Sequence, residues 1–196
     1  MTATSQRLPS RMRQLWLFAR NFVKHPKMLG SLIPSSRFLV RRMLREIDWS
    51  RATVLVEYGP GVGVFTAEML RRMRPDATLI VFETNQEFVD FLRHSIKDAR
   101  LRVVHGSAAE VLHHLEQAGH AHADYIVSGI PYSTMPAEVR DAILSASHRV
   151  LRPGGKFLVY QFSRASLPYV RRVFPRVWVA LEPLNIPPAT AYICQV

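Results

Sequence analysis

Cysteine is nearly absent from this chain of 196 residues, in which Cys194 is the single example. One thiol cannot form an internal disulfide, which excludes the disulfide-stapled secreted domains and fits a reducing compartment. No uninterrupted apolar run reaches the roughly 18 residues of a membrane span, and the N-terminus lacks the apolar core of a signal peptide. We therefore expect one cytoplasmic α/β domain, since the length allows a single core.

Acidic residues are missing from two long stretches of the chain. Residues 1–45 carry ten Lys or Arg and residues 142–181 carry seven, in both cases without an acid. Residues 46–141 hold nine bases and fourteen acids, so the net charge of +11 resides on the two flanks. Basic flanks favour a polyanionic partner, and on charge alone an anionic bilayer and a nucleic acid are equal candidates.

Metal-ligating patterns are also lacking. Four of the eight histidines, His113, His114, His120 and His122, lie close together in the sequence. Their spacing matches no closed zinc pattern and no cysteine accompanies them. We expect no metal.

The most informative stretch that is present runs from Thr53 to Gly63. An apolar, β-branched run ends in Glu57 and is followed by glycines at positions 59, 61 and 63. This pattern predicts a buried parallel strand that turns tightly into a helix. Glycines suit such a turn because side chains would block a ligand from the backbone N–H groups at the helix N-terminus.

A second apolar run, residues 79–82, ends in Glu83, twenty residues after Gly63. A carboxylate at this strand end can accept hydrogen bonds from both hydroxyls of a ribose. We therefore expect Glu83, with Thr84 beside it, to form part of a nucleotide site.

Strand and helix patterns alternate along the rest of the chain, which predicts a parallel sheet covered by helices on both faces. The expected strands are 53–58, 77–83, 101–105, 124–129 and 156–162, with two final strands near 176–184 and 189–196. The expected helices between them are 64–74, 86–97, 108–118, 136–151 and 166–174. The last two strands are close enough in sequence to form a hairpin, so one of them must run antiparallel.

Together, the glycine motif, Glu83 and the turn Leu151–Gly155 resemble the class I S-adenosylmethionine (SAM)-dependent methyltransferases. The resemblance implies a Rossmann-like seven-stranded sheet of order 3-2-1-4-5-7-6 and SAM as methyl donor, with S-adenosylhomocysteine (SAH) as product. It implies a cofactor site formed by Glu57, Gly59, Gly61, Gly63, Glu83, Thr84, Ser107, Ala108 and Ser128. From the residues alone, Ser107 could equally be the N-cap of the following helix.

The end of the fourth predicted strand, residues 128–133, is where this superfamily places its substrate. Methyltransferases of adenine place an Asn or Asp at the position of Gly129, and without that acceptor a planar amine loses one of its anchors. Residues 128–131, Ser-Gly-Ile-Pro, instead resemble the corresponding loop of bacterial phospholipid N-methyltransferases. That likeness implies methylation of phosphatidylethanolamine towards phosphatidylcholine, with Ile130 and Pro131 at the substrate.

No strong general base is evident for this chemistry. A primary ammonium entering a desolvated pocket lowers its own pKa, so a water or a hydroxyl such as that of Tyr132 or Ser128 could accept its proton. These two residues are our catalytic candidates. Tyr132, with Trp16, Tyr160 or Tyr192 as neighbours, could also hold a cationic intermediate by cation–π contact.

The N-terminal segment, residues 1–50, is expected to form an extension to the methyltransferase domain, residues 51–196. Its pattern predicts a basic amphipathic helix over residues 9–28, followed by a second helix through about Ile47, for which Pro34-Ser35-Ser36 offers an N-cap. The first helix could pack on the domain as a lid, bind a bilayer surface, or do both. Residues 22–37 also resemble the N-terminal segment of the phospholipid N-methyltransferases.

These patterns favour a lipid methyltransferase that binds anionic lipids at the inner face of the plasma membrane. The membrane or substrate contacts we expect are Trp16, Arg20, Lys24, Ser35 and Arg37. An RNA adenine N-methyltransferase is the first alternative, so nucleic acid stays open as a partner. A cofactor-binding adaptor without transfer activity is the second.

Overall fold

The computed structural model describes residues 35–196, and the predicted helix over residues 9–28 lies outside this range. The strands are β1 (Val54–Tyr58), β2 (Thr78–Glu83), β3 (Leu101–His105), β4 (Ala123–Ser128), β5 (Leu151–Gln161), β6 (Arg176–Glu182) and β7 (Ala189–Gln195). The α-helices are α2 (Arg37–Leu44), α3 (Val64–Arg72), α4 (Gln86–Ser95), α5 (Val111–Gln117), α6 (Ala137–Val150) and α7 (Leu167–Val173). A 3₁₀ turn, Ala108–Glu110, precedes α5.

The seven strands form one sheet of order β3-β2-β1-β4-β5-β7-β6. Strands β1 to β5 pair in parallel, whereas β7 runs antiparallel to both β5 and β6. This arrangement confirms the predicted sheet order and the antiparallel last strand. The carboxyl ends of β1, β2, β4 and β5 therefore lie at one edge, where open α/β sheets bind ligands.

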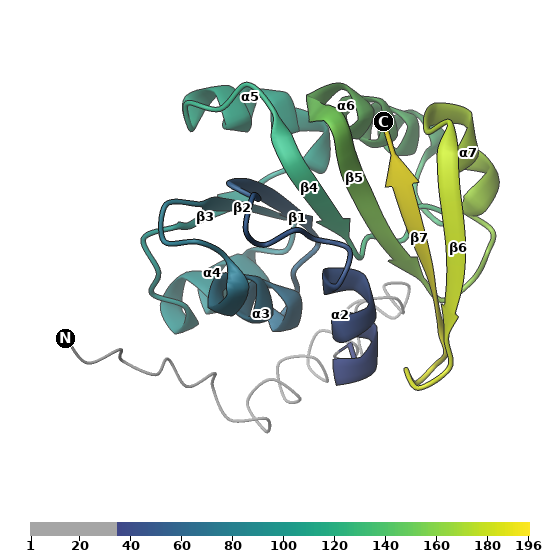
Figure 1. The fold of residues 1–196 in the computed structure, drawn as a ribbon, viewed down its shortest axis with the longest axis horizontal. Coiled ribbons are helices and arrows are strands. Elements are labelled where there is room, and N and C mark those ends of the chain that lie inside the picture. The colour runs from purple at the N-terminus through teal and green to yellow at the C-terminus, as the bar shows by residue number, and fades with distance from the viewer. Residues whose placement is uncertain (1–34) are drawn as a thin grey trace.

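Helices cover both faces of the sheet (Figure 1). Helices α5, α6 and α7 pack on one face, around Tyr58, Ile126 and Phe157. Helices α2, α3 and α4 pack on the other, around Leu55, Val127 and Leu158. Successive side chains of a strand point to opposite faces of the sheet, so the residues of β1 contribute to both cores.

Helix α2 belongs to this second core although it lies within the predicted N-terminal extension. Its residues Leu39, Val40, Met43 and Leu44 are buried in the core. The Ser36 side chain accepts a hydrogen bond from the Leu39 N–H at 3.2 Å, which makes Ser36 the predicted N-cap.

Strand β5 begins at Leu151, five residues before the predicted start at residue 156. The pairing partner of Ala123 is Leu151, but that of Tyr125 is Lys156, so residues 152–155 form a bulge. Gly154 in this bulge has a φ of +76°. The sequence Arg-Pro-Gly-Gly was predicted as a turn because glycine and proline usually interrupt strands; here the interruption lies inside the strand.

Among residues 35–196, no helix is long and apolar enough to cross a bilayer.

Candidate cofactor and substrate site

The glycine turn between β1 and α3 leaves bare backbone at the carboxyl edge of the sheet. Gly59 and Gly63 have φ values of +68° and +79°, which L side chains rarely adopt. A Cβ on Gly59 would lie 2.7 Å from Ile130 Cγ2, and one on Gly63 would lie 2.7 Å from Leu92 Cδ2. A larger residue at either position would be strained by the positive φ and would require the side chain of Ile130 or Leu92 to move.

Glu83 faces this turn from the end of β2. Its Oε2 accepts a hydrogen bond from the Gly61 N–H at 3.3 Å, and its Oε1 accepts one from the Asn85 N–H at 2.9 Å. Burial raises the pKa of the carboxyl, while these backbone N–H groups oppose the shift. The structure thus brings Glu83 and Gly61 together, as the nucleotide-site prediction requires.

Glu57 lies beneath the turn at the end of β1. Its Oε2 accepts a hydrogen bond from the Thr66 hydroxyl at 2.6 Å. Burial raises the pKa of Glu57 to about 8, the Thr66 hydroxyl opposes the rise, and the nearby Glu83 charge adds to it. The carboxyl groups of Glu57 and Glu83 are thus both buried next to the glycine turn. A positively charged ligand bound there would favour the ionised form of each.

The third predicted loop follows β3 and contains Ser107 and Ala108. The Ser107 hydroxyl accepts a hydrogen bond from the Ala109 N–H at 3.2 Å, which is the N-cap role that the sequence left open. Ala108 is buried in the core. The His105 ring contacts the Thr84 carbonyl oxygen at 3.1 Å and so joins this loop to the end of β2.

Tyr132 and Ser128, the predicted catalytic pair, lie in the core and are fully buried. Their hydroxyl oxygens are 2.8 Å apart, and the Tyr132 ring meets the edge of Phe157 at a centroid distance of 6.2 Å. This placement does not present the Tyr132 hydroxyl to a substrate. It instead fixes the loop of residues 128–132 to the sheet, so the geometry does not support a proton-accepting role for Tyr132.

Tyr160, near the end of β5, is the aromatic residue that lies beside Gly129. A Cβ on Gly129 would lie 2.5 Å from Tyr160 Cζ, so the phenol fills the space beside Gly129. Its ring stacks on Phe65 at a centroid distance of 5.1 Å, and its hydroxyl interacts with the Ser35 side chain. Burial raises the pKa of Tyr160 to about 12, opposed by Ser35 and assisted by the charges of Glu57 and Glu83.

The remaining predicted substrate residues fall into two groups. Ile130 packs against Gly59, and its carbonyl oxygen accepts a hydrogen bond from Gln161 Nε2 at 2.8 Å. Pro131 and Arg37 are exposed. The positions Trp16, Arg20 and Lys24 lie outside the described residues.

Sequence reasoning assigned no function to Thr66 or Gln161 and named Tyr160 only as one of several aromatics. The signal for Tyr160 was its position near the carboxyl end of a predicted strand, where side chains reach the ligand edge. Within residues 35–196, no three His, Cys, Asp or Glu side chains gather as a metal site.

Comparison with known proteins agrees with this geometry. A family model described as a methyltransferase domain matches residues 55–155, just over half of the chain. The chain is 36% identical over 186 residues to an ornithine lipid N-methyltransferase of Singulisphaera acidiphila, covering 94% of this chain and 97% of that one. Ribosomal RNA small subunit methyltransferase A of Mycoplasma mycoides is 25% identical over 89 residues, which is 45% of this chain and 32% of that protein.

Solved structures show the same fold. Precorrin-6y C5,15-methyltransferase of Geobacter metallireducens superposes with a TM-score of 0.64 at 16% identity, covering 80% of this chain and 88% of that one. Human methyltransferase-like protein 13, solved in complex with SAH, superposes with a TM-score of 0.59 at 20% identity, covering 88% and 82%. Together with the family match and the glycine turn facing Glu83, these likenesses establish that the chain belongs to the class I SAM-dependent methyltransferases.

Proposed function

We propose that this enzyme methylates the primary amine of a membrane lipid, with SAM as the donor. The observation that carries the proposal is the similarity to an ornithine lipid N-methyltransferase, which extends over 94% of the chain. It agrees with the resemblance of residues 128–131 to the phospholipid N-methyltransferases. Phosphatidylethanolamine is our first candidate headgroup, converted stepwise towards phosphatidylcholine, and the ornithine lipid suggested by this relative is the second.

The acceptor side of the site favours an aliphatic amine over adenine. An Asn at position 129, which would accept a hydrogen bond from a planar exocyclic amine, would require the Tyr160 side chain to move out of that space. A flexible headgroup amine does not need a flat pocket with two fixed acceptors. It needs to be held close to the methyl donor as a neutral nucleophile.

The residues at the carboxyl edge fit a bound SAM. Glu83 would accept the ribose hydroxyls, and the glycine turn would allow close approach of the cofactor to the backbone. Glu57, whose pKa burial raises to about 8, would provide negative charge near the turn once the positively charged cofactor favours its ionised form. When bound, SAM supplies the methyl group on a positively charged sulfur.

Tyr160 is our candidate for the residue that orients the acceptor amine. With a pKa of about 12, its phenol stays neutral at physiological pH, so its oxygen can accept a hydrogen bond from the amine. The electron-rich ring can stabilise the methylated ammonium by cation–π contact. We assign no side chain as the general base, and the proton lost from the ammonium would pass to water.

The enzyme would act at the inner face of the plasma membrane as a peripheral protein. The basic, acid-free stretch of residues 1–45 supports binding to anionic lipid.

Incubation of the purified full chain with radiolabelled SAM tests the proposal. Vesicles containing phosphatidylethanolamine, vesicles containing ornithine lipid, and total RNA serve as separate acceptors, and Glu83→Ala is the inactive control. We expect label in the lipid fraction, with the more rapidly methylated vesicle identifying the headgroup. Label in RNA alone, or in no acceptor, would contradict the proposed function.

A further inference from the structure

The turn between β6 and β7, residues 183–188 and hereafter the hairpin tip, exposes aliphatic side chains. Leu184 is 58% exposed and Ile186 is 78% exposed. Phe38, on the first turn of α2, is 39% exposed. Large apolar side chains at a protruding turn weaken solubility, which indicates that this surface is covered when the protein functions.

The hairpin tip is fixed to α2 by polar contacts. Asn185, between the two exposed aliphatic residues, accepts a hydrogen bond at Oδ1 from the Ser36 N–H at 2.8 Å. The Asn185 side chain also donates to the Pro187 carbonyl oxygen at 2.7 Å. At the base of the turn, Arg42 of α2 forms an ion pair of 2.7 Å with Glu182. These contacts join the tip to the start of α2, the helix that carries Phe38.

Helix α2, to which the hairpin tip is bonded, carries two exposed arginines. The Arg37 guanidinium lies 4.9 Å from the centre of the Phe38 ring, and Arg41 follows one turn later on α2. Both arginines are exposed, and neither forms an ion pair with a carboxylate of residues 35–196. A lipid bilayer has an apolar interior and can carry anionic headgroups at its surface. Exposed aliphatic side chains, together with arginines that form no ion pair with a described carboxylate, complement both features.

The hairpin tip lies at the same edge of the sheet as the cofactor site. Strand β6 is antiparallel to β7, which is antiparallel to β5, so β6 runs in the direction of β4 and β5. The turn after β6 therefore projects beyond the carboxyl ends of the strands. Figure 1 shows α2 and this turn together below the arrowheads of β4 and β5.

We infer that the hairpin tip and α2 form a second membrane-docking surface, in which Leu184 and Ile186 insert into an anionic bilayer while Arg37 and Arg41 bind its phosphates. This inference rests on the proposed lipid substrate and adds a site within the catalytic domain itself. RNA fits the arginines but leaves two aliphatic side chains in water. A protein groove fits the aliphatic side chains but does not need arginines without ion pairs.

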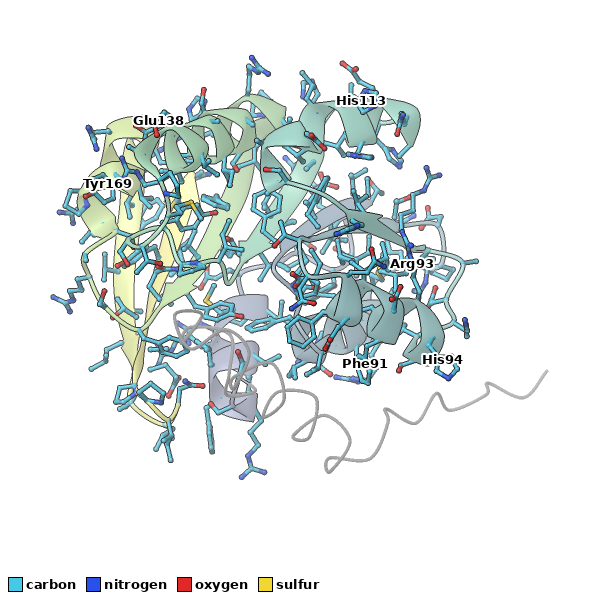
Figure 2. The ribbon with its side chains drawn as sticks, turned by 180° about the vertical axis from the view of Figure 1, so that it is seen from behind. Phe91, Arg93, His94, His113, Glu138 and Tyr169 are labelled. Atoms are coloured by element: carbon cyan, nitrogen blue, oxygen red, sulfur yellow. The ribbon has the colours of Figure 1, made fainter. Side chains whose placement is uncertain are left out.

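Tryptophan fluorescence tests insertion without reference to activity. Ile186→Trp is compared with wild type on vesicles of phosphatidylglycerol and phosphatidylcholine, with and without brominated acyl chains. We expect a blue shift and bromine quenching of the added fluorescence. The matched control is Val139→Trp, since Val139 is 42% exposed on α6. Figure 2 labels its neighbour Glu138 on α6, far from the hairpin tip. Fluorescence at position 186 that shows neither change would overturn the inference.

A binding measurement tests the energetic contribution. The double variant Leu184→Ser, Ile186→Ser should bind the anionic vesicles about tenfold more weakly, because two apolar side chains no longer enter the bilayer. Val139→Ser should bind as wild type, and unchanged SAH affinity shows that the double variant is folded. Equal vesicle binding by the double variant and wild type would refute the inference, whatever lipid is methylated. Failure to methylate any lipid, with insertion intact, would refute only the proposed function.

Discussion

Glu83 holds its carboxylate between the glycine turn and the Asn85 N–H while almost completely buried. In Glu83→Ala a charged acceptor for the ribose disappears, which should cost about 1.5–3 kcal/mol of binding free energy, or more than tenfold in SAH affinity. Isothermal titration calorimetry measures this loss. The exposed Asp90→Asn on α4 provides the control and should bind as wild type. Wild-type affinity in folded Glu83→Ala would show that another residue holds the ribose.

Glu57 should make the stability of the protein depend on pH. Its pKa of about 8 in the folded state lies above its ordinary value of 4.5. Between these values the folded protein binds a proton that the unfolded chain releases, so stability falls as pH rises from about 5 to about 8. The side chain at position 57 cannot titrate in Glu57→Gln, so the stability of this variant should fall less over the same pH range. Urea unfolding of both proteins across this range checks it, and parallel curves would contradict the assignment.

The Tyr160 hydroxyl should affect turnover more than cofactor binding. Tyr160→Phe keeps the ring that stacks on Phe65 but removes the acceptor oxygen beside Gly129. We expect about tenfold slower lipid methylation, equivalent to the loss of one hydrogen bond, with SAH affinity unchanged. Ser35→Ala serves as the control for the lost Ser35 contact. If Ser35→Ala slows the reaction as much, Tyr160 acts by anchoring Ser35.

The roles of residues in short sequence motifs could be predicted. Roles that depend on contacts between residues far apart in the sequence could not. The glycine turn and Glu83 follow from motifs read along one segment. The space beside Gly129, which directly follows β4, is filled by the ring of Tyr160 on the neighbouring strand β5 and not by that of Tyr132. A sequence pattern places Tyr132 in the loop after the fourth strand and Tyr160 on the fifth strand, but it does not give the contacts that either ring makes.

Among the elements, the pairing of α2 with the β6–β7 hairpin depends on Asn185. In Asn185→Ala the Ser36 N–H loses its acceptor in a partly buried position, and the turn loses its bond to the Pro187 carbonyl. We expect a loss of about 1–3 kcal/mol in the free energy of unfolding, measured by urea denaturation. Thr134→Ala removes an exposed loop hydroxyl that bonds the Pro131 carbonyl, and should change stability by less than about 0.5 kcal/mol. Equal stabilities of the two variants would show that α2 is held by its apolar face alone.

The existence and order of the elements could be predicted because apolar runs alternate with helical patterns along residues 53–162. Their boundaries depended on local chemistry that the patterns did not resolve. The start of β5 was placed too late because glycine and proline were interpreted as a turn, whereas pairing with Ala123 extends the strand to Leu151. The segment 108–118, predicted as one helix, consists of a 3₁₀ turn that Ser107 caps and of helix α5.

At the scale of the whole molecule, the basic N-terminal stretch should add to the membrane affinity of the domain. Deleting residues 1–24 removes five positive charges and the predicted apolar face, each charge contributing about 1 kcal/mol near an anionic leaflet. We expect loss of cosedimentation with anionic vesicles, and a stronger effect of salt on wild type with anionic than with neutral lipid. Full-rate lipid methylation by a truncated protein that still cosediments would contradict a membrane role for this stretch.

The position of β7 between β5 and β6 has a consequence for biosynthesis. Strand β6 leaves the ribosome before β7 but can pair only with β7, so it must wait for a segment translated after it. During that interval β5 also presents an unpaired edge, the kind of surface through which nascent chains aggregate. The half of the sheet around β1 can therefore assemble during translation, while completion of the other half is delayed until β7 has emerged. Chaperone dependence of this protein should accordingly be greatest for chains stalled between β6 and β7.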